Sequence, residues 1–329
     1  MIFSRRSFCA VMALGLMFSA TAHAQEWPAK QPIRIVVPYP AGGNADSAAR
    51  ALGETVGAGL KQTFIVNNRP GASSIIGTEV VARAPADGYT IGVVSDSHAI
   101  NHAMAKLPKA VEALGTKVPY DAVNDFVPVS GVILIPLVLV VNPDVPARSV
   151  RELIDVSRNR KGLHFGTMGT GSPWFIHMHQ LAEATGAVFI DVPYKGLAPA
   201  ATDLIGGQTD IMLMPVHYAQ QYIGTGKLVP IATLGAQRPP LLPDVPALVE
   251  SGYPGLDISN YLFFVAPAGT PQAIVDTLHQ EFKNALATPE MKEKLGLSGD
   301  PYLAGPAELA ARLRRDIDTY GKVIQNTLK

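Results

Sequence analysis

The fold is decided by residues 33–46, which read IRIVVPYPAGGNAD. An apolar run at 33–37 is followed by a loop of small residues and then by a helical pattern from about Ala45 to Leu60. A short loop between a strand and a helix leaves backbone N–H groups unpaired at the positive end of the helix dipole. Because the loop contains no Lys or Arg, the stretch predicts an anion site whose donors are backbone amides and ordered water.

The first half of the chain alternates strands and helices. We expect strands at 33–37, 64–67 and 89–94, separated by helices at 45–60 and 74–83. This order predicts a parallel sheet with right-handed crossovers, in which ligands lie at the carboxyl ends of the strands. A second alternating set follows, with expected strands at 136–141, 163–165, 189–192, 210–214 and 229–234 and helices at 150–160, from about 173, and at 199–206. A strand at 261–265 and helices at 271–287 and 306–328 complete the pattern.

A second loop of the same kind lies at residues 166–173, GTMGTGSP. Pro173 suits the first position of a helix and Ser172 its N-cap. Hydroxyl groups of Thr167, Thr170 and Ser172 join the free amides, again without Lys or Arg. The glycine spacing matches neither a dinucleotide fingerprint nor a P-loop. One such loop could be a tight turn that only caps its helix, but two at equivalent places favour an anion held from both sides.

The first 24 residues have the pattern of an export signal. Arg5 and Arg6 precede an apolar stretch at 10–20 that is too short to span a bilayer. Residues 22–24 fit a small-x-small cleavage site, which makes Gln25 the expected mature N-terminus. We therefore expect a periplasmic protein, exported by the general secretory route or, given the paired arginines, by the twin-arginine route.

Removing this leader leaves 25 basic and 27 acidic residues, a net charge of −2, with no long run of one sign. This balance argues against nucleic acid and anionic membrane surfaces as partners. Cys9, the only cysteine, leaves with the leader, so the mature chain is expected to have no disulfide and no thiolate metal site. About 305 residues are enough for a self-sufficient core and suit two domains.

Seven short pieces spread over nearly the whole mature chain match, in order, the pattern of a known family. They are residues 38–46 (PYPAGGNAD), 68–72 (NRPGA), 86–90 (ADGYT), 136–143 (PLVLVVNP), 192–196 (VPYKG), 203–210 (DLIGGQTD) and 264–271 (FVAPAGTP). No single piece is very specific, but all of them in this order are. The chain resembles a periplasmic receptor of the Bordetella uptake gene family, the solute-binding component of tripartite tricarboxylate transporters.

The resemblance implies an α/β fold of the type II periplasmic-binding-protein kind, in which two domains joined by two crossover strands close like a flytrap. By that pattern residues 136–141 carry the chain into domain 2 and residues 261–265 carry it back. Domain 1 is then 25–134 plus 253–329, and domain 2 is 135–252. The resemblance also implies a carboxylate ligand, held by both loops through amides, hydroxyls and ordered water. No cofactor is expected.

The expected ligand-binding residues come from the two loops and from the neighbouring strand ends. They are Tyr39, Ala41, Gly42, Gly43, Asn44, Ser95, His98, Thr167, Gly169, Thr170, Gly171, Ser172, Trp174, Tyr194, Lys195 and His217. Trp174 could stack on a flat ligand or pack on the helix flank. Lys195 could contact a ligand carboxylate or pair with a surface acid. His98 is expected at the mouth of the cleft, and His217 either reaches the cleft or is a surface residue.

Two departures from the family pattern bear on the ligand. Residues 106–118 form a longer segment than usual, either a surface excursion or a roof over the cleft. Pro215 stands where the family often has an acidic residue, which removes a partner for a ligand amine. A plain organic acid is therefore favoured over an amino acid.

These observations predict a monomeric receptor that captures a di- or tricarboxylate, or an aromatic carboxylate, and delivers it to membrane transporter subunits. A sensor subunit that signals to a membrane kinase fits the same fold. A periplasmic hydrolase or lyase is the enzyme alternative, but the sequence contains no Gly-x-Ser-x-Gly elbow. His98 and His102 have a metal-ligand spacing, yet no acidic residue completes a zinc motif, so no metal is expected.

Overall fold

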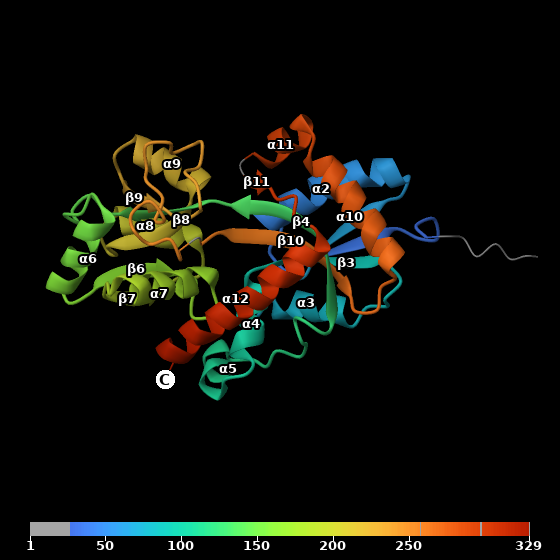
Figure 1. Cartoon of the computed structure of the whole chain (residues 1–329), viewed down its shortest axis with the longest axis horizontal. Helices are drawn as coiled ribbons and strands as arrows, with labels where there is room; N and C mark the ends of the chain where they lie inside the picture. Colours follow the sequence, from blue (N-terminus) through green and yellow to red (C-terminus); the bar gives the residue numbers. More distant parts are fainter. Residues whose placement is uncertain (1–26, 257, 297, 329) are drawn as a thin grey trace, which may run out of the picture.

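The computed structural model describes residues 27–256, 258–296 and 298–328, which form two lobes side by side (Figure 1). The expected leader at 1–24, including Cys9, lies outside the described residues. Within these ranges no helix combines the length and apolar character needed to cross a membrane.

The first lobe is built on a six-stranded sheet with the order β11-β4-β10-β3-β1-β2. Its strands are β1 (Ile33–Val37), β2 (Phe64–Asn68), β3 (Thr90–Ser95), β4 (Phe126–Ile135), β10 (Asn260–Pro267) and β11 (Asp300–Pro301). β1 pairs in parallel with both β2 and β3, as the β-α-β-α-β pattern predicts. β10 runs antiparallel between β3 and β4, so the sheet as a whole is mixed.

Helices cover both faces of this sheet, which explains why β1 is almost continuously apolar. On one face, Ile35 and Val37 pack with α2 (Asn44–Leu60) and α10 (Gln272–Leu286). Val36 points to the other face, towards α3 (Ile75–Ala82) and α12 (Pro306–Thr327). The remaining helices of the lobe are α4 (Ser97–Met104), α5 (Pro108–Leu114) and α11 (Pro289–Leu295).

The second lobe has a five-stranded sheet with the order β7-β6-β8-β5-β9. Its strands are β5 (Leu137–Val141), β6 (Leu163–Thr167), β7 (Phe189–Pro193), β8 (Ile211–Pro215) and β9 (Val229–Thr233). Its helices are α6 (Val150–Asn159), α7 (Pro173–Thr185), α8 (Leu197–Ile205) and α9 (Val216–Gly224). β6 is parallel to β7 and β8, whereas β5 is antiparallel to β8 and β9. The expected second α/β unit is therefore present, with one reversed strand, β5, between β8 and β9.

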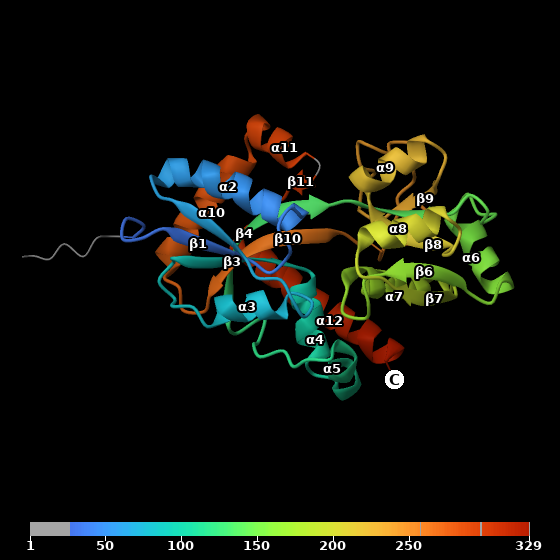
Figure 2. The ribbon, with the colours of Figure 1, turned by 180° about the vertical axis from the view of Figure 1, so that it is seen from behind.

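Two passages of chain connect the lobes. Pro136 alone separates β4 from β5, and residues 234–259 lead from β9 back to β10. β4 and β10 pair along their whole length, from Phe126 opposite Pro267 to Ile135 opposite Asn260. Both passages therefore leave the first lobe next to each other (Figures 1 and 2). The structure thus has the expected two-lobe α/β fold with two crossing strands.

The C-terminal helix α12 also reaches from one lobe to the other. It packs along α4 and contacts α7 of the second lobe, as Figure 1 shows for the red helix. One buried apolar cluster combines Ile100 of α4, Ile176 of α7 and Ile324 of α12. The apolar contact between the lobes is therefore made on the side of α4, α7 and α12.

Five elements of the structure, β4, β11, α5, α9 and α11, are not predicted from the sequence. β4 lacks a clean alternation because Pro128, Ser130 and Gly131 interrupt it, and its pairing with β10 contains register shifts. At Gly131 an added Cβ would lie 2.2 Å from the carbonyl oxygen of Tyr302, so the chain of residues 302–304 crosses the strand where it has no side chain. That tertiary contact leaves no local sequence pattern.

Gly77 offers a test of how tightly α3 packs on the sheet. An added Cβ would lie 2.6 Å from both the carbonyl oxygen of Arg69 and Cβ of Pro38, and these neighbours cannot rotate away. We expect Gly77→Ala to lower the free energy of unfolding by about 2 kcal/mol, because overpacking exceeds the helix-propensity gain of alanine. Gly224→Ala, with nothing within 4 Å of its Cβ, is the control and should be neutral or slightly stabilising in urea unfolding. Equal stabilities of the two variants would contradict this packing.

Candidate functional site

The first loop joins β1 to α2 on the side of the first lobe that faces the second lobe (Figure 2). Gly43 is the N-cap of α2 and makes no side-chain cap, so the first amides of the helix have no intrahelical acceptor. Gly42 adopts φ +82°, a conformation that glycine reaches without strain. Ala41, Gly42 and Gly43 are exposed and Asn44 is half-buried. This geometry leaves donors at a helix start that can hold an anion.

Asp46 stabilises this loop through hydrogen bonds and is not itself a donor for an anion. Its Oδ2 accepts a hydrogen bond from the Gly42 amide at 2.9 Å, and its Oδ1 accepts one from Asn68 Nδ2 at 3.0 Å. Arg50 Nη2 lies 2.9 Å from the same Oδ1. Burial by itself would raise the pKa of the Asp46 carboxyl, but the bonds from Arg50, Gly42 and Asn68 outweigh it and hold the pKa below its usual value. The Gly42 amide is thus already used, and Gly43 and the start of α2 offer the free donors.

A network of hydroxyl groups fixes the carboxyl ends of β1 and β3 beneath the loop. Tyr39 Oη donates to Ser95 Oγ at 2.8 Å and lies 3.2 Å from Ser97 Oγ. Ser97 Oγ in turn lies 2.8 Å from Ser95 Oγ and 3.2 Å from Ser74 Oγ. Burial raises the pKa of the Tyr39 hydroxyl, so it stays protonated. Tyr39 and Ser95 therefore make bonds within the lobe and support the loop.

A third loop, which the sequence does not single out as part of the candidate site, follows β2. Gly71, Ala72, Ser73 and Ser74 have successive φ values of 135°, 46°, 51° and 74°. Such conformations cost non-glycine residues free energy and are concentrated at functional sites. Asn101 Nδ2 holds the turn by donating to the carbonyl oxygen of Ser73 at 2.9 Å. The sequence signal was the run of small residues after an expected strand, which by itself indicates only a turn.

The second loop follows β6 and begins α7. Thr167 Oγ1 donates to Asp191 Oδ1 at 2.6 Å and accepts from the Gly169 amide at 3.1 Å. Burial raises the pKa of the Asp191 carboxyl. Ser172 is the N-cap, accepting from the Phe175 amide at 3.3 Å, with Pro173 at the first helical position, as predicted. Thr167 is therefore part of the loop's internal bonding.

Free donors of this loop are the amides of Thr170 and Gly171 and the hydroxyl of Thr170, for which no hydrogen bond is found among the described residues. The Ser172 hydroxyl accepts from the backbone, and its proton remains available to donate. No Lys or Arg occurs between residues 162 and 194, and residues 166–173 contain no His either. Both loops thus have the neutral donors that the sequence predicts.

The structure brings the second loop against the first lobe. A Cβ added at Gly171 would lie 3.3 Å from Ser73 Oγ and 2.8 Å from Leu114 Cδ2. Below this contact, His177 Nε2 of α7 lies 3.2 Å from Asp96 Oδ2, and both side chains are buried. Asp96 sits between β3 and α4 at the carboxyl edge of the first sheet. The two lobes are therefore in direct polar and apolar contact beside the candidate site.

The other predicted residues of the second lobe have less direct placements. Tyr194 Oη donates to Asp203 Oδ2 at 2.8 Å, and burial together with this acid raises the pKa of Tyr194 to about 12. Lys195 is exposed just before α8, and His217 is half-buried in α9, where burial lowers its pKa. Trp174 is half-buried against the apolar core, and its buried Nε1 has no acceptor within the described part of the chain. Stacking of Trp174 on a ligand stays a prediction.

His98 differs from expectation, because its side chain points into the core of the first lobe. Its ring lies 4.8 Å from the Phe126 ring and 5.7 Å from the Tyr120 ring, and Nε2 is 3.2 Å from the carbonyl oxygen of Ala122. Burial lowers the pKa of His98 to about 4. A position just after a strand end lies near the ligand edge of the sheet, but this does not determine where its side chain points. The His98 side chain points away from that edge and is not part of the candidate site. His102 is held separately, accepting from the Ala122 amide at 3.2 Å.

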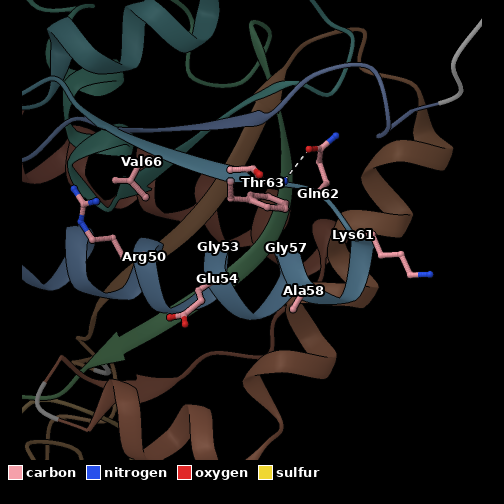
Figure 3. Close-up of a pocket in the computed structure, with 10 residues that line it drawn as sticks. Arg50, Gly53, Glu54, Gly57, Ala58, Lys61, Gln62, Thr63 and Val66 are labelled. Carbon is pink, nitrogen blue, oxygen red and sulfur yellow. Dashed lines mark hydrogen bonds between the residues drawn. The ribbon is translucent and has the colours of Figure 1, made fainter.

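A surface groove of about 580 Å³ lies elsewhere on the first lobe, between α2 and β2 (Figure 3). It is open because Gly53, Gly57 and Ala58 present little side chain to it. Arg50 and Glu54 also line it, but it contains none of the predicted ligand-binding residues. The two loops therefore remain the candidate site.

The chain is similar to known proteins over most of its length. The sequence pattern of the family described as "Tripartite tricarboxylate transporter family receptor" matches residues 48–327. Protein BugT of Bordetella pertussis is 34% identical over 313 residues, which cover 94% of this chain and 93% of BugT.

Two solved structures of similar fold are of proteins with a bound ligand. R. palustris Rpa4515 with adipate is 29% identical, with a TM-score of 0.76 over 91% of this chain and 98% of that one. MatC (Rpa3494) from Rhodopseudomonas palustris with bound malate is 26% identical, with a TM-score of 0.73 over 90% of this chain and 99% of that one.

The buried neutral His98 predicts a specific acid sensitivity. In the unfolded chain this imidazole binds a proton below about pH 6.5, but in the folded protein only near pH 4, so unfolding takes up a proton between these values. Stability should fall as pH falls from 6.5 to 4, by about 3 kcal/mol from this group. We expect the free energy of unfolding of His98→Gln, measured with urea, to depend less steeply on pH between 6.5 and 4 than that of the wild type. The exposed His164→Gln is the control, and identical slopes for His98→Gln and wild type would contradict the assignment.

Proposed function

Because the chain belongs to the family of tripartite tricarboxylate transporter receptors, we propose that it binds a small organic carboxylate between its lobes and delivers it to membrane transporter subunits. The observation that carries this proposal is the pair of helix-start loops, one on each lobe, with free amides and hydroxyls and no basic side chain. The family is one of solute-binding receptors rather than enzymes.

The proposed ligand is a di- or tricarboxylate or an aromatic carboxylate. Adipate and malate, named for two structural relatives, are both dicarboxylates, which supports the first of these classes. Pro215 ends β8 where an acid could have paired with a ligand amine, and this favours a plain acid. The free indole N–H of Trp174 is consistent with a further polar contact to either class.

The proposed contacts are the free donors of the two loops. Gly43 and Asn44 would bind through amides at the start of α2, and Thr170, Gly171 and Ser172 through amides and hydroxyls at the start of α7. Ala41 and Gly42 shape the first loop, while Tyr39, Ser95, Thr167 and Gly169 hold the two loops in place through the bonds described above. Ser73 joins the proposed site because it lies beside Gly171.

We further propose that the two lobes act as domains, with domain 1 formed by 25–134 and 253–329 and domain 2 by 135–252. Closure would rotate them about the passages at Pro136 and before β10. A ligand that bridges both loops stabilises the closed state because only there does it touch both lobes. Export to the periplasm and function as a monomer complete the proposal.

The direct test is ligand-dependent thermal unfolding of mature protein, residues 25–329, with a panel of organic acids and with amino acids and sugars as controls. A ligand present at a hundred times its dissociation constant should add about 2.7 kcal/mol to the free energy of unfolding. Stabilisation by one class of carboxylate is the expected result. Folded, ligand-free protein that responds to no acid would contradict the proposed function.

Removing loop hydroxyls should then weaken the binding of that acid. We expect Thr170→Val and Ser172→Ala each to raise Kd about tenfold in calorimetric titration, the loss of about one hydrogen bond to a charged group. Ser172→Ala also loses a helix cap, at a cost of about 1 kcal/mol in stability. Ser149→Ala is the matched control, because Ser149 caps α6 in the same way, away from the loop. Unchanged Kd in both loop variants would remove the second loop from the site.

A further inference from the structure

Helix α5 contributes an apolar side chain to the edge of the proposed ligand site. Leu114, its last residue, approaches Gly171 so closely that a Cβ there would lie 2.8 Å from Leu114 Cδ2. Gly171 stands between Thr170 and Ser172, whose hydroxyls are proposed ligand donors. A hydrocarbon side chain from the first lobe therefore lies directly beside the second loop.

The rest of α5 is built to hold Leu114 in this position. Leu107, Ala110 and Leu114 recur at spacings of three and four residues, which places them on one helical face. This face belongs to the same apolar cluster as Phe175 and Ile176 of α7. Lys109 and Glu112 are exposed on the remaining surface of the helix. One face of the segment at 106–118 thus packs across the boundary between the lobes, and its other face is exposed.

We propose that Leu114 is a specificity residue of the carboxylate site, an inference that rests on the proposed function. With a carboxylate held by the second loop, the adjoining part of the ligand meets the Leu114 side chain. An apolar wall there favours methylene or ring carbons next to the bound carboxylate and limits how far the ligand extends on that side. A second charged group would lose hydration at this wall without gaining a partner.

The first experiment compares ligand preference among variants. Kd is measured by calorimetry for α,ω-dicarboxylates from malonate to suberate with wild type, Leu114→Ala, Leu114→Met and Glu112→Ala. Leu114→Ala should weaken the acid that wild type prefers by about tenfold and move the optimum to longer chains. Leu114→Met, which keeps the volume, and Glu112→Ala, on the exposed face, should keep the wild-type order. An unchanged order in Leu114→Ala overturns the proposal.

The second experiment tests the contact without any ligand, so that it separates this inference from the proposed function. Gly171→Ala should lower the melting temperature in the wild-type background and lower it less in Leu114→Ala, because removing the leucine makes room for the new methyl group. If the changes in melting temperature of the two single variants simply add in the double variant, the two residues do not touch, and the proposed position of Leu114 beside the second loop is refuted.

The two experiments together distinguish the ways in which the account can fail. If wild type binds no acid of the series or of the wider panel, the proposed function and the specificity role are both wrong, even where the melting temperatures are coupled. If wild type binds an acid but Leu114→Ala keeps the same order of affinities, the function stands and the specificity role alone is overturned.

Discussion

The antiparallel pairing of β4 with β10 is the interaction on which the arrangement of the two lobes depends. These strands pair from Phe126–Pro267 to Ile135–Asn260, and both connections to the second lobe leave from the same end of the pair. Pro136 follows β4 at once, and its carbonyl oxygen accepts a bond from the Val216 amide of the second lobe. Because the passages are neighbours, the proposed closure requires only that the lobes rotate about this one region while each sheet keeps its own core.

The proposed binding of the ligand depends on the same division of the chain into two lobes, because each lobe contributes one loop. A buried ion pair is costly to desolvate, whereas amides and hydroxyls at a helix start bind an anion at a moderate cost. Two carboxyl groups close to the loops already have partners: Asp46 with Gly42 and Arg50, and Asp96 with His177. Each lobe therefore offers neutral donors, and only a ligand that touches both lobes gains from closure.

Much of this could be predicted from the sequence, because local patterns carry it. The strand–loop–helix stretch at 33–46, the Ser172–Pro173 helix start and the alternation of elements all appear in the structure near the expected positions. Contacts between distant segments could not be predicted. Three features depend on tertiary packing: the aromatic rings around His98, the crossing of β4 by residues 302–304, and the contact of Leu114 with Gly171. The structure is likewise needed to tell which loop donors are free, because Asp46 accepts from the Gly42 amide and Asp191 from the Thr167 hydroxyl.

The central claim, that the lobes close on a carboxylate, is tested most directly by a distance between them. Residues 25–329 contain no cysteine, so spin labels can be placed at Ser47→Cys on α2 and Ala198→Cys on α8, both exposed. Double electron–electron resonance is recorded with and without an acid that stabilises the protein in thermal unfolding. The acid is expected to narrow the distance distribution and to shift it towards the shorter distances of the arrangement in which the lobes are in contact. The same distribution in both samples would contradict closure on the ligand.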